Sequence, residues 1–270
     1  MNCIPIHITL CLAAPRRRRL TVRASVVRLP SWQLPSFCIV NASRQFVTLR
    51  MQDAATGSTE DVCPMWLEPV EAKTALAKAV EQQPNAGLAL GTIPMGKAFA
   101  LSEGWATAEG ATRFRLSAHG RMVEELRPML NKQLEQQGLP TTPHVLPIFF
   151  CEELTTDTMM PVFLSRAELV STWDAAMKAA GKKEPPPKKF TAMDLRILAR
   201  RMQSGGMDWS IVRFVGTSRA YETVREAQRQ EEERKDAEPP PLQSDPDAEP
   251  PPLESSGAGG ASASDSVEVA

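Results

Sequence analysis

The chain has 270 residues with 31 basic and 32 acidic side chains, and its two ends carry opposite charge: residues 1–30 contain six arginines and no acid, whereas residues 231–270 contain eleven acids and two bases. Residues 31–230 carry 23 basic and 21 acidic side chains, and this nearly neutral body disfavours a nucleic-acid-binding protein, which needs a basic face to neutralise phosphates. No segment approaches the roughly 20 apolar residues of a membrane-spanning helix, and the five cysteines form neither a zinc pattern nor a disulfide framework, so we expect a soluble mature protein.

Residues 1–31 have the composition of a targeting leader. An apolar opening, Ile4–Ala14, precedes the basic run Arg16–Arg19, which is the reverse of the order in a secretory signal. An acid-free, arginine-rich segment is typical of an organelle transit peptide, and Val22-Arg23-Ala24 resembles a plastid cleavage site. A bipartite leader, a basic arm without a targeting role and a misplaced start codon remain as alternatives.

The first half of the folded body is expected at residues 32–138, with strands and helices in alternation. A β-hairpin is predicted around the turn at 41–44, and a helix is predicted to begin at Pro69, where a missing N–H is tolerated. The inward side of this helix is predicted to hold Val70, the Lys73 stem, Leu76 and Val80. The other elements expected in this half are strands Val62–Leu67, Leu88–Ile93 (buried) and Thr112–Leu116, a short helix Met95–Leu101, and a helix with Val123, Leu126, Leu130 and Leu134 on one face that ends at Gly138 and Pro140.

The second half is expected at residues 143–227. Strands Leu146–Cys151 and Met159–Leu164 precede a helix in which Ser165 and Glu168 have the spacing of a capping box. The further elements expected here are a buried helix stripe of Leu169, Trp173 and Met177, a solvated linker at 181–189, an N-cap at Thr191 or Asp194, a buried stripe of Leu195, Leu198 and Met202, a strand Trp209–Val215, and a helix from Thr217 into the charged run 226–236.

The two halves resemble each other in sequence order. Leu34-Pro35 matches Leu146-Pro147, and Pro64, Trp66 and Leu67 match Pro161, Phe163 and Leu164. This pattern predicts an α/β (α+β) fold of two pseudo-symmetric halves, each a small sheet with packed helices, derived from an internal duplication. Residues 228–270 form a predicted disordered acidic tail rich in Pro, Ser and Gly, in which DAEPPPL occurs twice.

No pattern of catalytic residues is found. The three histidines lack metal-ligand spacing, and the sequence contains no nucleophile elbow, Walker loop or dinucleotide fingerprint. Glu152, Glu153 and Asp157 fit a solvated turn, and Cys38, Cys63 and Cys151 fit small buried side chains in strands. The sequence therefore predicts a protein that is not an enzyme and has no cofactor or metal. Its twelve methionines and paired strand aromatics either fill the cores or line grooves for apolar peptides.

The succession of short motifs resembles the Tic-twenty-two family of chloroplast protein import. LPSFCIVNASRQFVTL, CPMWL, LGTIPMGKAFAL and FRLSAHGRMVEEL resemble its first half, and VLPIFFCEEL, MMPVFLSRAEL, FTAMDLRILARRM and WSIVRFV resemble its second half. The resemblance covers about residues 34–225. The Pro-Lys linker at 181–189, the loop at 52–61 and the acidic tail depart from it.

This resemblance implies a soluble protein of the intermembrane space of the plastid envelope, with two α/β halves and apolar pockets. It implies chaperone-like escort of precursor proteins with transit peptides between the outer- and inner-envelope translocons, whose components are the other expected partners. Contact with a membrane would be peripheral at most, and the family has no catalytic residues. We expect six apolar residues in or near the grooves, with about half of them in the core: Phe37, Ile39, Trp66, Phe149, Phe163 and Phe214.

Two other classes of function are open at this point. A thiol redox protein would need Cys38 and Cys151 within disulfide reach, yet alignment of the halves places Cys38 opposite Phe150. A structural adaptor between envelope complexes would present one broad apolar patch, whereas a chaperone would present grooves.

Overall fold

The computed structural model describes residues 7–8, 32–52, 57–108, 113–183, 185–186, 190–205 and 208–237. Apart from residues 7–8, the predicted leader lies outside this part of the chain, as does the predicted tail beyond residue 237. Contacts divide the chain into the units Met1–Gln230 and Glu231–Ala270, and all the packing described below lies within the first of these units.

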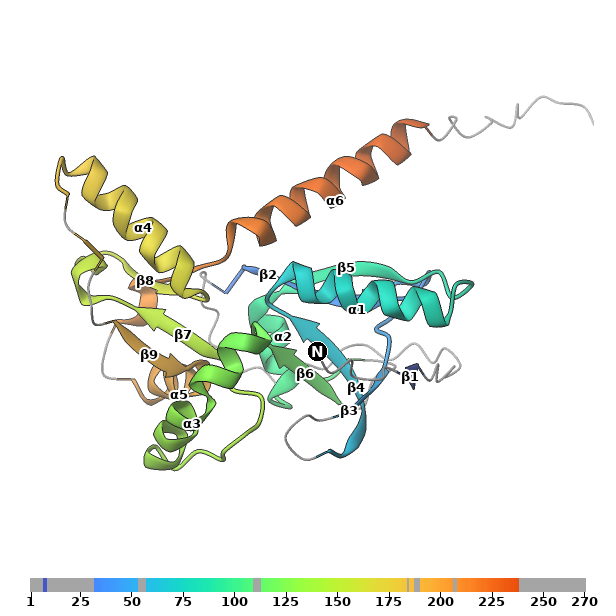
Figure 1. Cartoon of the computed structure of the whole chain (residues 1–270), viewed down its shortest axis with the longest axis horizontal. Helices are drawn as coiled ribbons and strands as arrows, with labels where there is room; N and C mark the ends of the chain where they lie inside the picture. The colour runs from blue at the N-terminus through green and yellow to red at the C-terminus, as the bar shows by residue number, and fades with distance from the viewer. Residues whose placement is uncertain are drawn as a thin grey trace, which may run out of the picture. The chain divides into compact units, whose positions relative to one another are not determined.

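The first sheet contains the strands of the first half together with β1, which lies within the predicted leader (Figure 1). Its order is β1-β3-β4-β2-β5, and β6 pairs with β4 on the other side. The strands are β1 (His7–Ile8), β2 (Pro35–Val40), β3 (Leu49–Gln52), β4 (Thr59–Trp66), β5 (Ala89–Pro94) and β6 (Phe114–Ser117). The helices of this half are α1 (Pro69–Gln82), α2 (Met95–Ser102) and α3 (Gly120–Gln136).

The second sheet has the order β10-β8-β7-β9. Its strands are β7 (Pro147–Phe150), β8 (Met160–Phe163), β9 (Thr191–Asp194) and β10 (Val212–Val215). The helices are α4 (Arg166–Ala179), α5 (Leu195–Ser204) and α6 (Ser218–Ala237), with short 3-10 turns at Glu152–Leu154 and Trp209–Ile211. The protein therefore has the predicted mixed α/β fold.

Both halves have the same pattern of strand pairing. β2 pairs antiparallel with β4 and β5, and β4 pairs parallel with β6. In the second half β7 pairs antiparallel with β8 and β9, and β8 pairs parallel with β10. The register follows the predicted match, since Phe37 lies opposite Trp66 and Phe149 lies opposite Phe163. The origin of this pattern by duplication stays a prediction.

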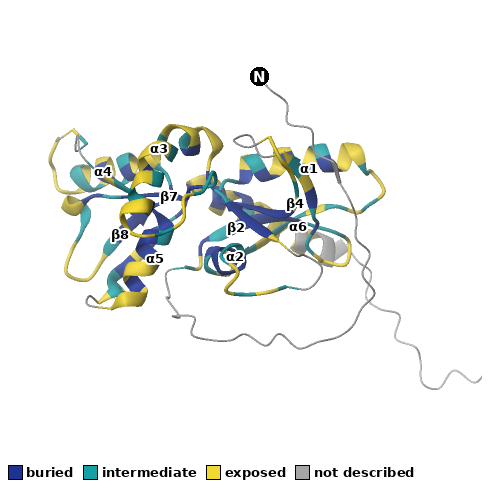
Figure 2. Ribbon diagram, turned by 90° about the horizontal axis from the view of Figure 1, so that it is seen from below, coloured by how far each residue is buried: buried dark blue, intermediate teal, exposed yellow. Residues whose placement is uncertain are grey.

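Buried residues lie on the strands and on the helix faces that contact them (Figure 2), and among the described residues they form three hydrophobic clusters. The largest contains buried residues of both halves, among them Met65, Phe99 and Ile148, and so joins the two sheets into one unit. The second cluster surrounds Phe37 and Ile39 under α1, and the third surrounds Phe149, Phe163 and Trp173 under α4.

The last helix of each half covers the cluster of the other half. Helix α3 follows β6 of the first sheet, but its Met122 and Leu126 pack on the cluster around Phe149. Helix α6 follows β10 of the second sheet, but Ala220 is buried in the cluster around Phe37, and Val224 packs against it. The two halves are therefore interlocked rather than merely adjacent.

The inward side of α1 differs from the prediction. Ala72, Ala75 and Ala79 are buried, whereas Val70 and Val80 are 51% and 38% exposed. The physical reason is that small side chains let the helix lie close to the sheet, a feature that hydrophobicity alone does not show.

Strand β5 also differs from the prediction, because it is a half-exposed edge strand rather than a buried one.

The predicted hairpin forms only at its turn. The Val47 N–H donates to the Ile39 carbonyl across the turn (3.0 Å), but β3 pairs with β4 and β1 and not with β2. At the other end of the body, α6 continues to Ala237, so the first ten residues assigned to the disordered tail are helical.

The residues that begin and end the helices agree with the prediction more closely than the faces of the helices do. Pro69 occupies the first turn of α1, and the Ser165 hydroxyl accepts the Ala167 N–H (3.2 Å) at the start of α4. Gly138, with φ 65°, ends α3 with a Schellman motif, in which the Leu139 N–H donates to the Leu134 carbonyl (2.9 Å). The predicted stripes of α4 and α5 are buried, except that Met177 is half-buried.

Candidate functional site

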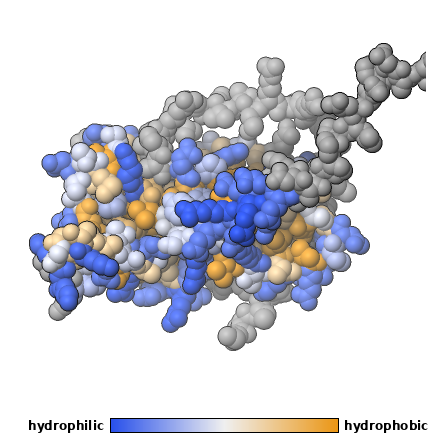
Figure 3. Space-filling model, turned by 90° about the horizontal axis from the view of Figure 1, so that it is seen from above, coloured by the Kyte–Doolittle hydropathy of each residue, from blue (hydrophilic) through white to orange (hydrophobic). Residues whose placement is uncertain are grey.

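Apolar surface is distributed in separate patches on the face shown in Figure 3. There, apolar side chains lie between charged side chains wherever described residues form the surface. A pocket of about 680 Å³ combines both kinds of side chain, and helices of both halves contribute to it. This pocket is the candidate functional site.

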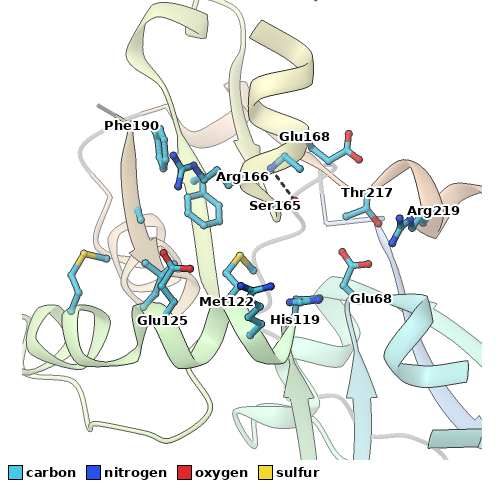
Figure 4. Close-up of a pocket in the computed structure, with 16 residues that line it drawn as sticks. Glu68, His119, Met122, Glu125, Ser165, Arg166, Glu168, Phe190, Thr217 and Arg219 are labelled. Atoms are coloured by element: carbon cyan, nitrogen blue, oxygen red, sulfur yellow. Dashed lines mark hydrogen bonds between the residues drawn. The ribbon is translucent and has the colours of Figure 1, made fainter. Parts of the chain in front are cut away.

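The starts of four helices meet at this pocket. Glu68, His119, Ser165 and Thr217 directly precede α1, α3, α4 and α6, and all four line the pocket (Figure 4). Because the two halves share one topology, Glu68 corresponds to Ser165, and His119 corresponds to Thr217. The polar end of the pocket therefore lies where the two halves meet.

Two carboxylates hold the starts of the crossing helices at this place. Glu71 of α1 accepts the backbone N–H of Gly120 at the start of α3 (2.8 Å). Glu168, at the corresponding position of α4, accepts the backbone N–H of Ser218 at the start of α6 (3.0 Å). The predicted capping box is thus only half correct, since Glu168 contacts another helix instead of its own first turn. Carboxylates at these positions also interact favourably with the positive ends of the helix dipoles.

Glu68 has a different environment. No hydrogen bond or ion pair to its carboxylate is present among the described residues, although it lines the polar end of the pocket. Burial raises the pKa of the Glu68 carboxyl; His119 and Arg219 lower it, and the neighbouring Glu71 and Glu168 raise it further.

The other end of the pocket is apolar. Helix α3 contributes Met122, Leu126 and Met129, and strand β7 contributes the buried ring of Phe149. Phe190, next to β9, packs its ring against that of Phe149 with centroids 5.8 Å apart. Met122 and Leu126 are half-buried and Met129 is exposed, so this wall is accessible to an incoming apolar group.

Charged side chains border the apolar end. The Arg166 guanidinium lies over the Phe190 ring, 4.9 Å from its centroid, and Glu125 projects from α3 on the opposite side (Figure 4). Arg121 and Arg219 add positive charge, which Glu68 and Glu168 balance. The pocket can thus bind an apolar side chain of a peptide, while polar residues next to it in the peptide lie near the charged groups at the border.

All six residues predicted to lie near the grooves are buried. Phe149 lines the pocket, and Trp66 lines a smaller pocket of about 240 Å³ beside α3. Phe37, Ile39 and Phe163 lie within the hydrophobic clusters, and Phe214 packs edge-on against Trp32 with ring centroids 4.9 Å apart. All six therefore belong to the hydrophobic clusters, and Phe149 and Trp66 also line a pocket. A role of the six in peptide binding stays a prediction.

Sequence reasoning missed the accessible wall of the pocket. Met122, Met129 and Phe190 are absent from the predicted site, because the predicted buried stripe of α3 consists of Val123, Leu126, Leu130 and Leu134 alone. The signal was present in the sequence, since Met122, Leu126 and Met129 recur every three to four residues on an adjacent face of the same helix.

The three cysteines of the described residues do not form a reactive site. Cys38, Cys63 and Cys151 are free and buried, and burial raises the pKa of the Cys38 thiol to about 11 and that of Cys63 still further. The pKa of Cys151 is raised by burial and by its hydrogen bond to Glu153. Thiols in this state react poorly as nucleophiles. Within the described residues, no group of three or more His, Cys, Asp or Glu could hold a metal ion, and no helix is long and apolar enough to cross a membrane.

Comparison with known proteins identifies the fold. No protein-family model matches the chain, and no curated protein matches it in sequence. Among solved structures, Tic22 from Plasmodium falciparum is similar, with a TM-score of 0.53 and 16% identity over 74% of this chain and 96% of that chain. Anabaena Tic22, described as protein transport, aligns with a TM-score of 0.48 and 14% identity over 73% of this chain and 93% of that chain. The first match shows that this chain has the Tic22 fold, as the sequence resemblance implies.

Proposed function

We propose that this protein is a non-enzymatic component of plastid protein import that binds apolar segments of precursor proteins in the pocket between α3 and α4. The observation that carries the proposal is the pocket itself, in which half-exposed Met and Phe side chains lie beside a charged border. The Tic22 fold supports it, because the sequence also resembles the Tic-twenty-two family of chloroplast protein import.

The binding step follows from the chemistry of the pocket wall. Met122 and Met129 are flexible and polarizable, so they can adjust to apolar side chains of different shape. The ring of Phe149 forms a fixed floor that Phe190 extends. Because the pocket is open to solvent, a bound segment is held weakly and can be released to the next component.

The place of action that fits this role is the intermembrane space of the plastid envelope, between the outer and inner translocons. The acid-free, arginine-rich residues 1–30 support import into a plastid. The partners would be precursor proteins and translocon components, with at most peripheral contact with a membrane. The pocket between α3 and α4 favours a groove-binding protein over an adaptor, which would present one broad patch.

The test is the suppression of aggregation of heat-unfolded citrate synthase by the full-length protein. We expect suppression at near-stoichiometric ratio, and a clear loss of it in Met129→Glu, because a charge in the wall opposes entry of apolar groups. Met159→Glu is the matched control, since Met129 and Met159 are 41% and 43% exposed but Met159 lies outside the pocket.

Absence of suppression by well-folded protein would overturn the proposal and favour the adaptor. Equal loss in the two variants would show that binding does not involve this pocket. Circular dichroism of each variant establishes that it is folded.

A further inference from the structure

Strand β5 forms an edge of the first sheet, and its register defines which of its backbone groups point outward. The Met95 N–H donates to the Leu34 carbonyl (2.7 Å), so this pair is hydrogen-bonded. In an antiparallel ladder such pairs alternate with non-bonded pairs. Leu90 and Thr92, which lie opposite Ile39 and Phe37, therefore direct both their N–H and C=O groups away from β2.

A second contact agrees with this register. The carbonyl of Ile39, the partner of Leu90, accepts the Val47 N–H (3.0 Å), so Ile39 directs its backbone groups to the side away from β5. Within the described residues, no hydrogen bond to the outward backbone groups of Leu90 or Thr92 is present. These groups form an open row of donors and acceptors.

The corresponding strand of the second half has a protected edge. Ala192 of β9 occupies the position of Thr92, and its outward carbonyl accepts the side-chain amide of Gln133 from α3 (3.1 Å). Helix α3 packs along β9, whereas α6 contributes only its first turns to the first half. Among the described residues, one of the two equivalent edges is thus covered and the other is open.

Among the described residues, the open edge has one of the features that usually prevent pairing, the exposed Pro94 at its end, but it has no charge and no covering element. The sequence of β5, ALGTIP, contains no charged residue, and Ala89, Thr92 and Pro94 are exposed. Edge strands of soluble proteins are normally protected by Lys or Pro, by an inward charge or by a covering element. Pro94 lies beyond Leu90 and Thr92, so it limits the open row to these two residues. An uncharged and uncovered edge is suited to pairing with another strand.

We infer that β5 pairs antiparallel with β5 of a second copy of this chain, about a two-fold axis at Gly91. In this arrangement Leu90 of each copy lies opposite Thr92 of the other, and each pair exchanges both of its main-chain hydrogen bonds. The open row can pair with a second copy of itself because Leu90 and Thr92 lie on either side of Gly91. Each of these two residues has an outward N–H and an outward C=O. Neither copy presents a charge that would oppose the pairing.

Sedimentation velocity of the full-length protein over a wide concentration range tests this dimer. Thr92→Pro removes only the outward N–H, since the N–H of Thr92 takes no part in the ladder with β2, and proline is tolerated at such edge positions. We expect the dissociation constant to rise more than about tenfold, because each dimer loses two hydrogen bonds. Thr92→Val, which keeps the N–H, is the control and should associate like the wild type.

Thr92→Lys provides a second variant that places a charge on the edge without changing the backbone, and we expect it to be monomeric as well. The inference is wrong if the wild type remains monomeric at all concentrations, or if both Thr92→Pro and Thr92→Lys associate like the wild type. If the wild type is monomeric and Thr92→Pro loses suppression of citrate synthase aggregation, the edge accepts client peptides instead of a second copy.

Discussion

Asp194 connects the two halves at the scale of a single side chain. Its carboxylate is fully buried and accepts the N–H of Arg196 (2.8 Å), as its predicted capping position implies. It also accepts the N–H of Leu146 (2.8 Å), which is 48 residues away in the chain. Arg196 continues the network to Glu103 of the first half, with an N–O distance of 2.9 Å. The sequence predicted the cap but could not show the other two contacts, because they arise only when distant segments pack.

Replacement of Asp194 should therefore cost more than the loss of a surface cap. We expect Asp194→Ala to lower the free energy of unfolding by about 2–4 kcal/mol, because it leaves the N–H of Leu146 and the guanidinium of Arg196 without their buried partner. Urea denaturation measures this change. Asp174→Ala, on the exposed side of α4, should change stability by less than about 0.5 kcal/mol. Similar small effects of both substitutions would contradict this role of Asp194.

Glu68 provides a pH-dependent test of the polar end of the pocket. Its pKa is raised in the folded state, so the folded protein binds this proton more tightly than the unfolded chain does. The resulting stability is present below the ordinary Glu pKa and is lost as the pH rises through the raised pKa. We expect Glu68→Gln to gain stability relative to wild type between about pH 4 and neutrality.

Urea denaturation across this pH range checks the expected slope. Glu81→Gln, on the exposed end of α1, is the control and should show no such relative gain. A Glu68→Gln protein with the same pH dependence as the wild type would show that the carboxyl group is well hydrated.

At the scale of elements, most strands and helices could be predicted, but not their environments. The positions of β4, α1, α2, α3 and α4 follow from apolar spacing, Pro69, Ser165 and Gly138. The exposed valines of α1 could not be predicted, because periodicity does not show whether an Ala face or a Val face lies against the sheet. The edge position of β5 depends on strand order, which a local pattern does not determine.

The two faces of α1 can be distinguished by stability. We expect Ala79→Leu to destabilise the protein by about 1–3 kcal/mol, because Ala79 is fully buried and the close contact with the sheet leaves no room for a larger side chain. Val80→Ser should change stability by less than about 0.5 kcal/mol, since Val80 is largely exposed. Thermal unfolding followed by circular dichroism measures both. If Val80→Ser destabilised the protein more than Ala79→Leu, the inward face of α1 would be the one predicted from the sequence.

At the scale of the whole molecule, the crossing of α3 and α6 determines where the site lies. Each helix leaves its own sheet, is held at its start by Glu71 or Glu168, and covers the cluster of the other half. This exchange brings α3 opposite α4 and creates the pocket. The sequence indicated two related halves, but it contained no signal for the exchange, which is why the buried strand aromatics were predicted at the grooves instead of the residues of α3.

The most direct test of the central claim is methyl NMR of the full-length protein with labelled methionines, titrated with reduced, carboxymethylated lactalbumin as an unfolded client. We expect the signals of Met122 and Met129 to shift and broaden as the client binds, while that of Met159 remains unchanged. Assignment by single substitutions identifies the signals. Shifts at Met159 without shifts at Met122 and Met129, or no shifts in a protein that suppresses aggregation, would contradict binding in the pocket between α3 and α4.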